Sequence, residues 1–548
     1  MEGGRNVLYN MSWLREGQPF PPLEERPRLD RYAQNELLFN GEHFSDPVFR
    51  HRTSGRGFTL SMYDACAQRI SQVIGNFDDI ISFPVLLNYQ RFISTKMADL
   101  VAGEHPLITG KNEAENAKIK WVTDNTDFYE KLYSIVIDLS RFGDCPIRVY
   151  KNEYTDYYDF AIWDAGQWFP IVKQDGTYRI SKHCLAWMEN KSENPDVKDY
   201  YLHVQVYDVL EPSKIEYHVF HNGASGSTIG KEVTTETIET GFDKCPVFNL
   251  RPYAVSGTVF GYDDYVPIDA VMAEIIVRVS QISTILDKHA DPAMTGPVSM
   301  LKKDPQTGEL YLERSKFYGI NEEDTPPSYL TWEGQLTAAF DQLEFLVNQL
   351  YTLSEMGAAI TGGIDSSGNA VSGTAMRFKM VNPLAKARRV TNSLTDPLRK
   401  MLSVLCSNMP DIDEDTTEPK QNAEDTALPY GHISIQWKDG LPDDPREGLE
   451  MAKLASGETK MLPLEEALMA YLGKSQAEAT QLTEKLRELA EEALQRQLEL
   501  NAASNRNDDD DPNKSGPQDG TGVNPRKKGS KTGLKNFRSE NNKTQGEK

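Results

Sequence analysis

A chain of 548 residues with 39% hydrophobic residues has enough apolar material for two or more folded domains. Its net charge of −23 disfavours a protein that coats nucleic acid with a broad basic surface, but not one that surrounds a duplex without gripping it. No apolar run reaches the roughly 18 to 20 residues of a membrane span, and the first residues show no signal-peptide pattern. We therefore expect no membrane segment and synthesis in the cytoplasm.

The cysteines and histidines show no metal-binding pattern. An odd number of cysteines without a CxxC pair predicts reduced, mostly buried thiols at Cys66, Cys145, Cys184, Cys245 and Cys406. The nine histidines do not cluster in any ligand spacing. We therefore expect neither a metal site nor a cofactor.

The first part of the chain changes from proline-rich to helical. Residues 1–61 are rich in Pro, Arg and Glu and predict an extended arm with little core. From Met62 to Gly103 the pattern becomes helical, and Tyr89–Val101 places apolar residues three and four positions apart. Phe128–Phe142 predicts a second amphipathic helix, which Gly143 should end.

A strand-rich block follows. Short runs of β-branched and aromatic residues alternate with turn signals such as Asn222–Gly223. The predicted strands are Pro146–Lys151, Phe160–Trp163, Trp168–Lys173, Tyr200–Leu210 and Ile215–His221. We expect an antiparallel meander laid against the preceding helices.

Two apolar helical stretches, 268–289 and 336–356, flank an insert that predicts short strands and turns. β-Branched residues make a strand conceivable for the first stretch, but its length favours a helix. Both carry apolar side chains at helical spacing, on stripes wider than an isolated hairpin can cover. The candidate packing residues are Ile268, Met272, Ile275, Val279, Ile282, Phe340, Leu343, Val347 and Leu350.

The insert and the segment after the second helix hold further candidates. Lys302, Lys303, Arg314 and Lys316 of the insert could face a partner or DNA, or could be solvated. The segment 362–373 lacks the order of a phosphate loop and follows a helix rather than a strand, so we interpret it as a flexible loop. Its candidate residues are Gly362, Gly363, Ser366, Ser367, Gly368, Asn369 and Gly373.

A basic helix is predicted over 372–405, interrupted or kinked near Pro383 and Pro397. Its cations reverse the acidic balance of the chain locally. One interpretation is ion pairing between subunits on a solvated helix face, and the other is contact with phosphates. The residues concerned are Arg377, Lys379, Lys386, Arg388 and Arg389.

The C-terminal part begins with an acidic linker at 410–427 and a strand at Ile433–Trp437. Helices are predicted over Arg446–Leu454, Leu464–Leu472 and Gln476–Leu500, the last of them exposed or bundle-forming. From 503 to 548 the composition predicts a disordered tail.

Catalytic patterns are missing from the sequence. It has no nucleophile elbow and no phosphate loop. Paired acids such as Asp263–Asp264 suit helix starts, and Asp264 before Pro267 is the expected cap. We therefore expect no enzymatic activity.

Several segments, in this order and spacing, resemble the portal proteins of tailed double-stranded DNA bacteriophages of the siphophage type. They are SRFGDCPIRVYKN, IWDAGQWFPIVKQDGTY, CPVFNLRPY, GYDDYVPIDAVMAEIIVRVSQISTILDKHADPAMTGP, SGTAMRFKMVNPLAKARR and WKDGLPDDPREGLEMAKLASGET. The resemblance covers about residues 80–500 and rests on no single motif.

The resemblance implies an α+β portal fold that assembles as a ring of twelve subunits. The implied parts are an arm (1–61), a wing (62–262 with 374–430), two stem helices (263–289 and 336–357), a small β-containing clip (290–335), a tunnel loop (358–373), a helical crown (431–502) and a tail (503–548).

It also implies a location at one vertex of the capsid, after synthesis in the host cytoplasm, and a channel for genome packaging and ejection. Expected partners are further copies of the chain, double-stranded DNA, the terminase large subunit, a head–tail adaptor, the major capsid protein and a scaffold protein.

Two other classes of protein fit the sequence less well. A different virion structural protein, such as an adaptor or a scaffold-associated protein, would lack the helix–insert–helix arrangement. A packaging ATPase or nuclease would require a phosphate loop or a carboxylate cluster for magnesium.

Overall fold

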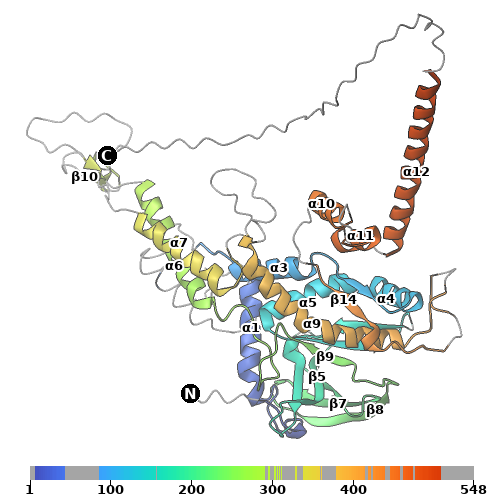
Figure 1. Cartoon of the computed structure of the whole chain (residues 1–548). Helices are drawn as coiled ribbons and strands as arrows, with labels where there is room; N and C mark the ends of the chain where they lie inside the picture. Colours follow the sequence, from blue (N-terminus) through green and yellow to red (C-terminus); the bar gives the residue numbers. More distant parts are fainter. Residues whose placement is uncertain are drawn as a thin grey trace, which may run out of the picture. The chain divides into compact units, whose positions relative to one another are not determined.

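The structure is a computed structural model of the chain, shown in Figure 1. It describes residues 7–43, 85–155, 157–194, 196–290, 337–357, 378–413, 417–420, 424–438, 445–456, 461–472 and 476–507, with Arg69, Ile360 and short pieces between 294 and 329. The fold is mixed α+β and divides into two compact units, Met1–Pro442 and Asp443–Lys548.

The N-terminal segment is part of the core, so the prediction of an extended arm is wrong for residues 7–43. Helix α1 spans Arg26–Asn40, and its Leu38 is fully buried. Before it, Trp13 and Phe20 pack against Phe169 of the sheet, with ring centroids 5.5 and 5.8 Å from that ring. These apolar residues are too sparse to form a periodic pattern, and the sheet supplies the surface that they cover.

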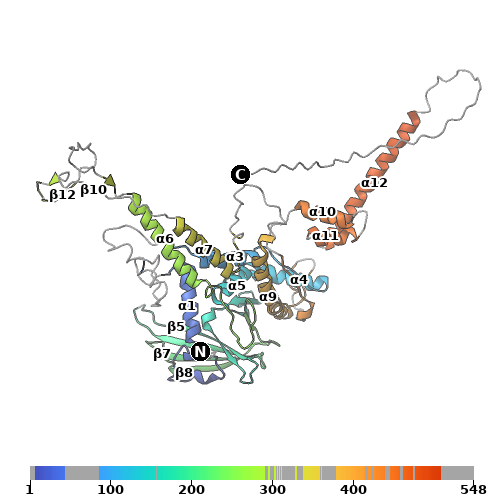
Figure 2. The same cartoon turned by 60° about the vertical axis from the view of Figure 1, so that its left-hand side comes forward.

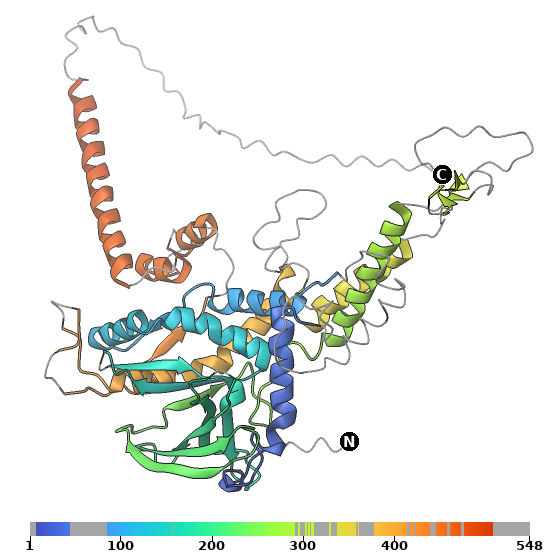
Figure 3. The same ribbon diagram turned by 180° about the vertical axis from the view of Figure 1, so that it is seen from behind.

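Four helices build one layer of the first unit: α3 (Tyr89–Ala102), α4 (Glu113–Asn125), α5 (Phe128–Phe142) and α9 (Val381–Ser407). The predicted bounds of α5 are confirmed, and Gly143 ends it with φ 79°. Helix α9 continues through Pro397, while Pro383 lies in its first turn, where a proline ring is tolerated. Figure 3 shows α3 and α5 over the sheet.

Besides three two-stranded pairs, the described residues of this unit form two larger antiparallel sheets. The three-stranded sheet has the order β3-β2-β9, and the five-stranded sheet runs β4-β5-β6-β7-β8. The strands are β2 (Cys145–Lys151), β3 (Tyr158–Ile162), β4 (Trp168–Val172), β5 (Ile180–Asn190), β6 (Tyr200–Asp208), β7 (Lys214–Gly223), β8 (Lys231–Glu239) and β9 (Val247–Leu250).

The predicted strands are confirmed, but β5 and β8 were not predicted. All nine residues of β8 are exposed, so the strand has no alternation of buried and exposed positions for a sequence pattern to reveal.

The two long apolar stretches form a helical hairpin, α6 (Asp269–Ala290) and α7 (Thr337–Leu353), which lie side by side in Figures 1 and 2. Within the insert, β10 (Met294–Thr295) pairs with β13 (Ser328–Tyr329), and β11 (Lys302–Lys303) pairs with β12 (Leu310–Tyr311). The predicted succession of helix, strands with turns, and returning helix is confirmed for these residues.

The C-terminal helices and the strand before them lie at the predicted positions. Strand β14 (Ser434–Gln436) pairs with β1 (Leu107–Thr109) of the first unit, so residues 431–438 do not belong with the C-terminal helices. The second unit contains α10 (Pro445–Ser456), α11 (Leu464–Leu472) and α12 (Gln476–Asn507). Helix α12 extends past the predicted end at Leu500.

Cys145, Cys184 and Cys406 are buried free thiols, as predicted, and burial raises the pKa of each. Cys66 lies outside the described residues. None of the helices that the structure describes combines the length and apolar character of a bilayer span.

Gly143, after α5, and Gly261, before α6, allow the two backbone segments to touch. A Cβ atom on Gly143 would lie 2.7 Å from the carbonyl carbon of Tyr262 and 2.8 Å from that of Gly261. Gly176 has the same φ of +79°, but a Cβ atom there would meet nothing within 4 Å. Substituting alanine at Gly176 therefore tests the cost of the left-handed backbone alone, whereas substitution at Gly143 adds a steric clash.

We predict that Gly176→Ala lowers the free energy of unfolding by about 1 kcal/mol, the cost of a left-handed residue, and Gly143→Ala by about 2 to 4 kcal/mol. Urea unfolding of the purified variants measures both changes. Equal losses would contradict a close contact at Gly143.

Candidate functional site at the root of the helical hairpin

The first site feature is the acidic pair before α6, whose two carboxylates have different roles. Asp263 Oδ1 accepts the backbone N–H groups of Tyr265 at 2.9 Å and Val266 at 3.0 Å. Asp263 therefore caps the turn into α6, and the prediction that Asp264 does so is wrong. The reason is an Asx-type turn, in which the side chain bonds the backbone two residues onward.

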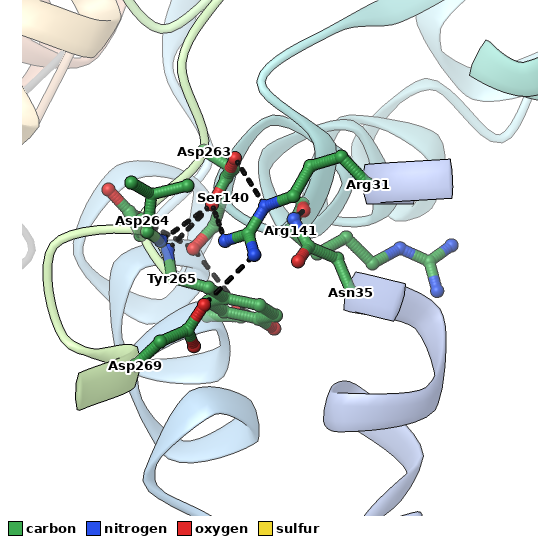
Figure 4. A network of polar contacts seen from close by, with 10 residues as sticks. Arg31, Asn35, Ser140, Arg141, Asp263, Asp264, Tyr265 and Asp269 are labelled. Carbon is green, nitrogen blue, oxygen red and sulfur yellow. Dashed lines mark hydrogen bonds and ion pairs between the residues drawn. The ribbon is translucent and has the colours of Figure 1, made fainter. Parts of the chain in front are cut away.

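Arg31 of α1 joins this turn to the helix that follows it. Its guanidinium lies 2.9 Å from Asp263 and 2.9 Å from Asp269, and Figure 4 shows it between the two carboxylates. Burial raises the pKa of Asp269, and Arg31 opposes that rise. Because a buried charge without a partner is costly, the pairing fixes α6 against α1.

Asp264 faces the opposite way, toward α5 and α9. It accepts a hydrogen bond from Ser140 Oγ at 2.6 Å and lies 2.7 Å from Lys386 Nζ. Lys386 also donates to the Ser354 carbonyl at 2.9 Å and is only 5% exposed. We call these four residues the root clasp, because they join the entry to α6, the end of α7, α5 and α9.

A second, more exposed contact lies beside the root clasp. Arg389 reaches both oxygens of Glu355 at 2.9 and 2.8 Å, and its guanidinium lies 5.5 Å from the Tyr253 ring centre. The two charged side chains are 41% and 48% exposed, so solvent screens their attraction. Glu355 has φ 59°, a left-handed conformation at the point where α7 has ended.

The buried carboxylate of Asp144 joins further segments to the same region. Asp144 accepts hydrogen bonds from Tyr32 Oη at 2.6 Å, Asn249 Nδ2 at 2.7 Å and the Gly261 N–H at 3.1 Å. Burial raises its pKa, and the bonds from Tyr32 and Asn249 oppose the rise. The segments SRFGDC and GYDDY, far apart in the sequence, therefore meet at Asp144 and the two glycines.

The predicted packing residues divide into three groups. Ile268, Met272, Ile275, Ile282 and Leu350 are buried; Val279, Leu343 and Val347 pack against the core while partly exposed; and Phe340 is 49% exposed. Ile276 and Val277 are also buried, so α6 is covered on more than the single predicted stripe.

The cationic candidates do not form one cluster in the described structure. Lys302 and Lys303 are exposed on β11, and Lys379, Arg388 and Arg389 are exposed around the start of α9. Lys386 is buried in the root clasp instead. Outside the described residues lie Arg314, Lys316, Arg377 and the loop residues Gly362, Gly363, Ser366, Ser367, Gly368, Asn369 and Gly373.

Sequence reasoning missed Arg31, Ser140 and Ser354. Each makes its contact with a residue more than 30 positions away, and no local pattern marks it. Among the described residues, no group of His, Cys, Asp or Glu could hold a metal ion.

The polar groups at this root therefore bond to one another and hold the helices together. Residues 85–496 match the family model described as phage portal protein, SPP1 Gp6-like, and the chain belongs to that family. It is a non-enzymatic component of the virion, located at the portal vertex where head and tail connect.

Solved structures that match this chain at low sequence identity include two chains of gene transfer agent particles. One chain of the virion of native gene transfer agent (GTA) particle matches with a TM-score of 0.39 and 10% identity, over 80% of this chain and 99% of that one. A chain in the neck of empty GTA particle matches with a TM-score of 0.39 and 9% identity, over 73% and 91%. No curated protein matches.

We predict that Lys386→Met lowers the free energy of unfolding by about 3 to 5 kcal/mol, because Asp264 then keeps a buried charge without its partner. Arg389→Met should cost at most about 1 kcal/mol, because that pair is exposed. Urea unfolding compares them, and adding Asp264→Asn to Lys386→Met should restore part of the loss. Similar losses from both single variants would show that the root clasp has no special role.

Proposed function

We propose that the chain forms a dodecameric ring at one capsid vertex, through which the genome is packaged and later ejected. The observation that carries this proposal is the family match over residues 85–496, combined with a helical hairpin fixed at its root by buried ion pairs. In this proposal the hairpin is the stem and its insert, 290–335, is the clip. The crown begins at Asp443 rather than at 431, and the tunnel loop is 358–373.

An exposed apolar face on α7 supports the ring. Phe345 is 60% exposed and Leu353 is 44% exposed, while Leu343 and Val347, on the other side of the helix, pack toward the core. Among the described residues, nothing covers this surface. In a ring, a neighbouring stem would cover it.

We propose a DNA path from the positions of exposed cations between α7 and α9. The tunnel loop connects the end of α7, where Glu355 and Arg389 pair, to the start of α9. Lys379, Arg388 and Arg389 are the exposed cations there, so phosphate contact is proposed for them and not for buried Lys386. The strongly acidic remainder of the chain would keep a duplex from adhering to the wall.

The proposed partners follow the order of events in a virion. Terminase large subunit docks during packaging, and head–tail adaptor proteins replace it afterwards. Lys302 and Lys303 on the exposed β11 hairpin offer a cationic edge for docking at the clip. The major capsid protein and a scaffold protein would surround the wing.

The first experiment is the native mass of the purified chain by mass photometry, with electron microscopy of the same sample. Twelve chains of 61.8 kDa give about 740 kDa. We expect rings near that mass with a central channel. A compact dimer without a channel, under conditions that include scaffold protein, would contradict the proposal.

We predict that Phe345→Asp abolishes ring formation, because assembly would bury an unpaired charge, whereas Phe345→Leu preserves it. Mass photometry reports the ring fraction, and circular dichroism shows that each subunit is folded. Normal rings from Phe345→Asp would show that this face of α7 does not lie in the subunit interface.

A further inference from the structure

The five-stranded sheet has two edges, and the N-terminal segment covers one of them. At that edge β4 pairs with the segment, and the N–H of Val172 donates to the carbonyl of Leu8 at 2.8 Å. The other edge is strand β8, which Figure 1 shows at the outer margin of the sheet. Among the described residues, only β7 forms backbone hydrogen bonds with β8. A row of backbone N–H and C=O groups therefore faces outward along β8.

The register of the β7–β8 pair identifies these outward groups. Thr240, directly after β8, donates its N–H to the Ser213 carbonyl at 2.8 Å, so these two residues form a hydrogen-bonded pair. Hydrogen-bonded and non-hydrogen-bonded pairs alternate along antiparallel strands. The residues whose N–H and C=O groups point away from β7 are therefore Thr235, Thr237 and Glu239. They can form the ladder of a further strand.

Strand β8 lacks most of the features that protect an exposed edge. It is nine residues long and has no proline, and its one lysine, Lys231, stands at the first position. Five of its residues are β-branched, which favours strand pairing. Val233 is 51% exposed and Ile238 is 40% exposed, so two apolar side chains lie in water. An edge of this kind is a template for strand addition.

The carboxylates of β8 differ in whether they already have a cationic neighbour. Glu232 lies 2.7 Å from a histidine of β7, and Glu239 stands opposite Lys214 in the strand pair. Glu236 stands opposite Tyr217 instead, whose pKa is raised first by burial and then by the charge of Glu236. Glu236 is therefore the acid of β8 to which the described residues supply no cation.

A strand added to β8 would place one of its side chains directly against Glu236. Thr235 and Thr237 would form hydrogen-bonded pairs with it, and Glu236 between them would form a non-hydrogen-bonded pair, in which opposed side chains come closest. Tyr217 lies beside Glu236 on the same face of the sheet, and Ile238 follows two positions along that face. A carboxylate beside an aromatic ring favours lysine or arginine.

A second copy of β8 fits this edge less well. It would bring its own Glu232, Glu236 and Glu239 to a seam that already holds the same three acids. Like charges that face each other across a strand pair are destabilising. An extended segment with a basic residue among β-branched residues matches both the open ladder and the unpaired acid.

We propose that β8 accepts an extended segment of another protein as a further strand of this sheet, with a lysine or arginine of that segment against Glu236. The backbone ladder supplies affinity, and the contact with Glu236 supplies selectivity. This surface lies apart in sequence and in fold from the helical hairpin. The inference therefore goes beyond the proposed function and does not depend on the ring.

Two synthetic peptides test the proposal with the purified full-length chain. Both have the nine-residue length of β8 and alternate threonine with valine, and the central residue is lysine in one and glutamate in the other. Surface plasmon resonance with immobilised peptide measures each Kd. We expect the lysine peptide to bind about tenfold more tightly to the unmodified chain, and Glu236→Lys to reverse the preference. Equal Kd values, or no binding of either peptide, would overturn the proposal.

A matched pair of variants at Thr237 tests strand pairing itself. The Thr237 N–H points away from β7, so a proline there removes an outward donor and leaves the β7–β8 ladder in place. Thr237→Pro should abolish binding of the lysine peptide, whereas Thr237→Val, which keeps the N–H, should preserve it. Circular dichroism verifies that both variants are folded. An unchanged Kd for Thr237→Pro would mean attraction without strand addition, against the proposal.

Mass photometry separates the remaining occupant and the proposed function. Particles of doubled mass that disappear with Thr237→Pro would show that a second copy occupies the edge, and would overturn the proposal. A chain that forms no ring but binds the lysine peptide selectively would support the β8 site while contradicting the proposed ring.

Discussion

The ammonium group of Lys386 lies where the entry to α6, the end of α7 and the helices α5 and α9 meet. It is almost completely withdrawn from water, and it contacts Asp264 at 2.7 Å and the Ser354 carbonyl at 2.9 Å. A buried charge is tolerated only while its partners hold their places. The hairpin can therefore leave this position only by exposing the lysine or leaving the aspartate unpaired. On the other side of the turn, Arg31 imposes the same condition on Asp263 and Asp269.

Two neighbouring contacts at the root of the hairpin differ in how firmly they hold it. The root clasp is buried and little affected by salt, whereas the Arg389–Glu355 pair is exposed and screened. The exposed pair lies where α7 has ended and the chain leads toward the Gly-rich segment. In the ring that we propose, helices fixed at their root would keep their positions relative to one another.

Among the described residues, nothing covers two apolar surfaces that lie in different units: the α7 face around Phe345 and Leu353, and the exposed leucines of α12. In the ring that we propose, every copy has the same two neighbours, and the α7 face is a surface that such a neighbour would cover.

The sequence by itself determined the features that are local. The 3.6-residue periodicity of Phe128–Phe142, the glycine after it, the two long apolar helices and the turn-rich insert were all predictable, because each pattern lies within a few turns of chain. The order of these segments was also enough to indicate the family.

Only the tertiary structure decided what fixes the hairpin. Arg31 meets Asp269 across 238 positions, and Ser140 meets Asp264 across 124. A lysine in a basic helix looks the same in sequence whether it faces solvent, as Lys379 does, or is buried like Lys386. Strand β8, exposed on both faces, and the N-terminal residues packed on the sheet lacked a pattern for the same reason. Their positions depend on surfaces that exist only after distant parts of the chain have come together.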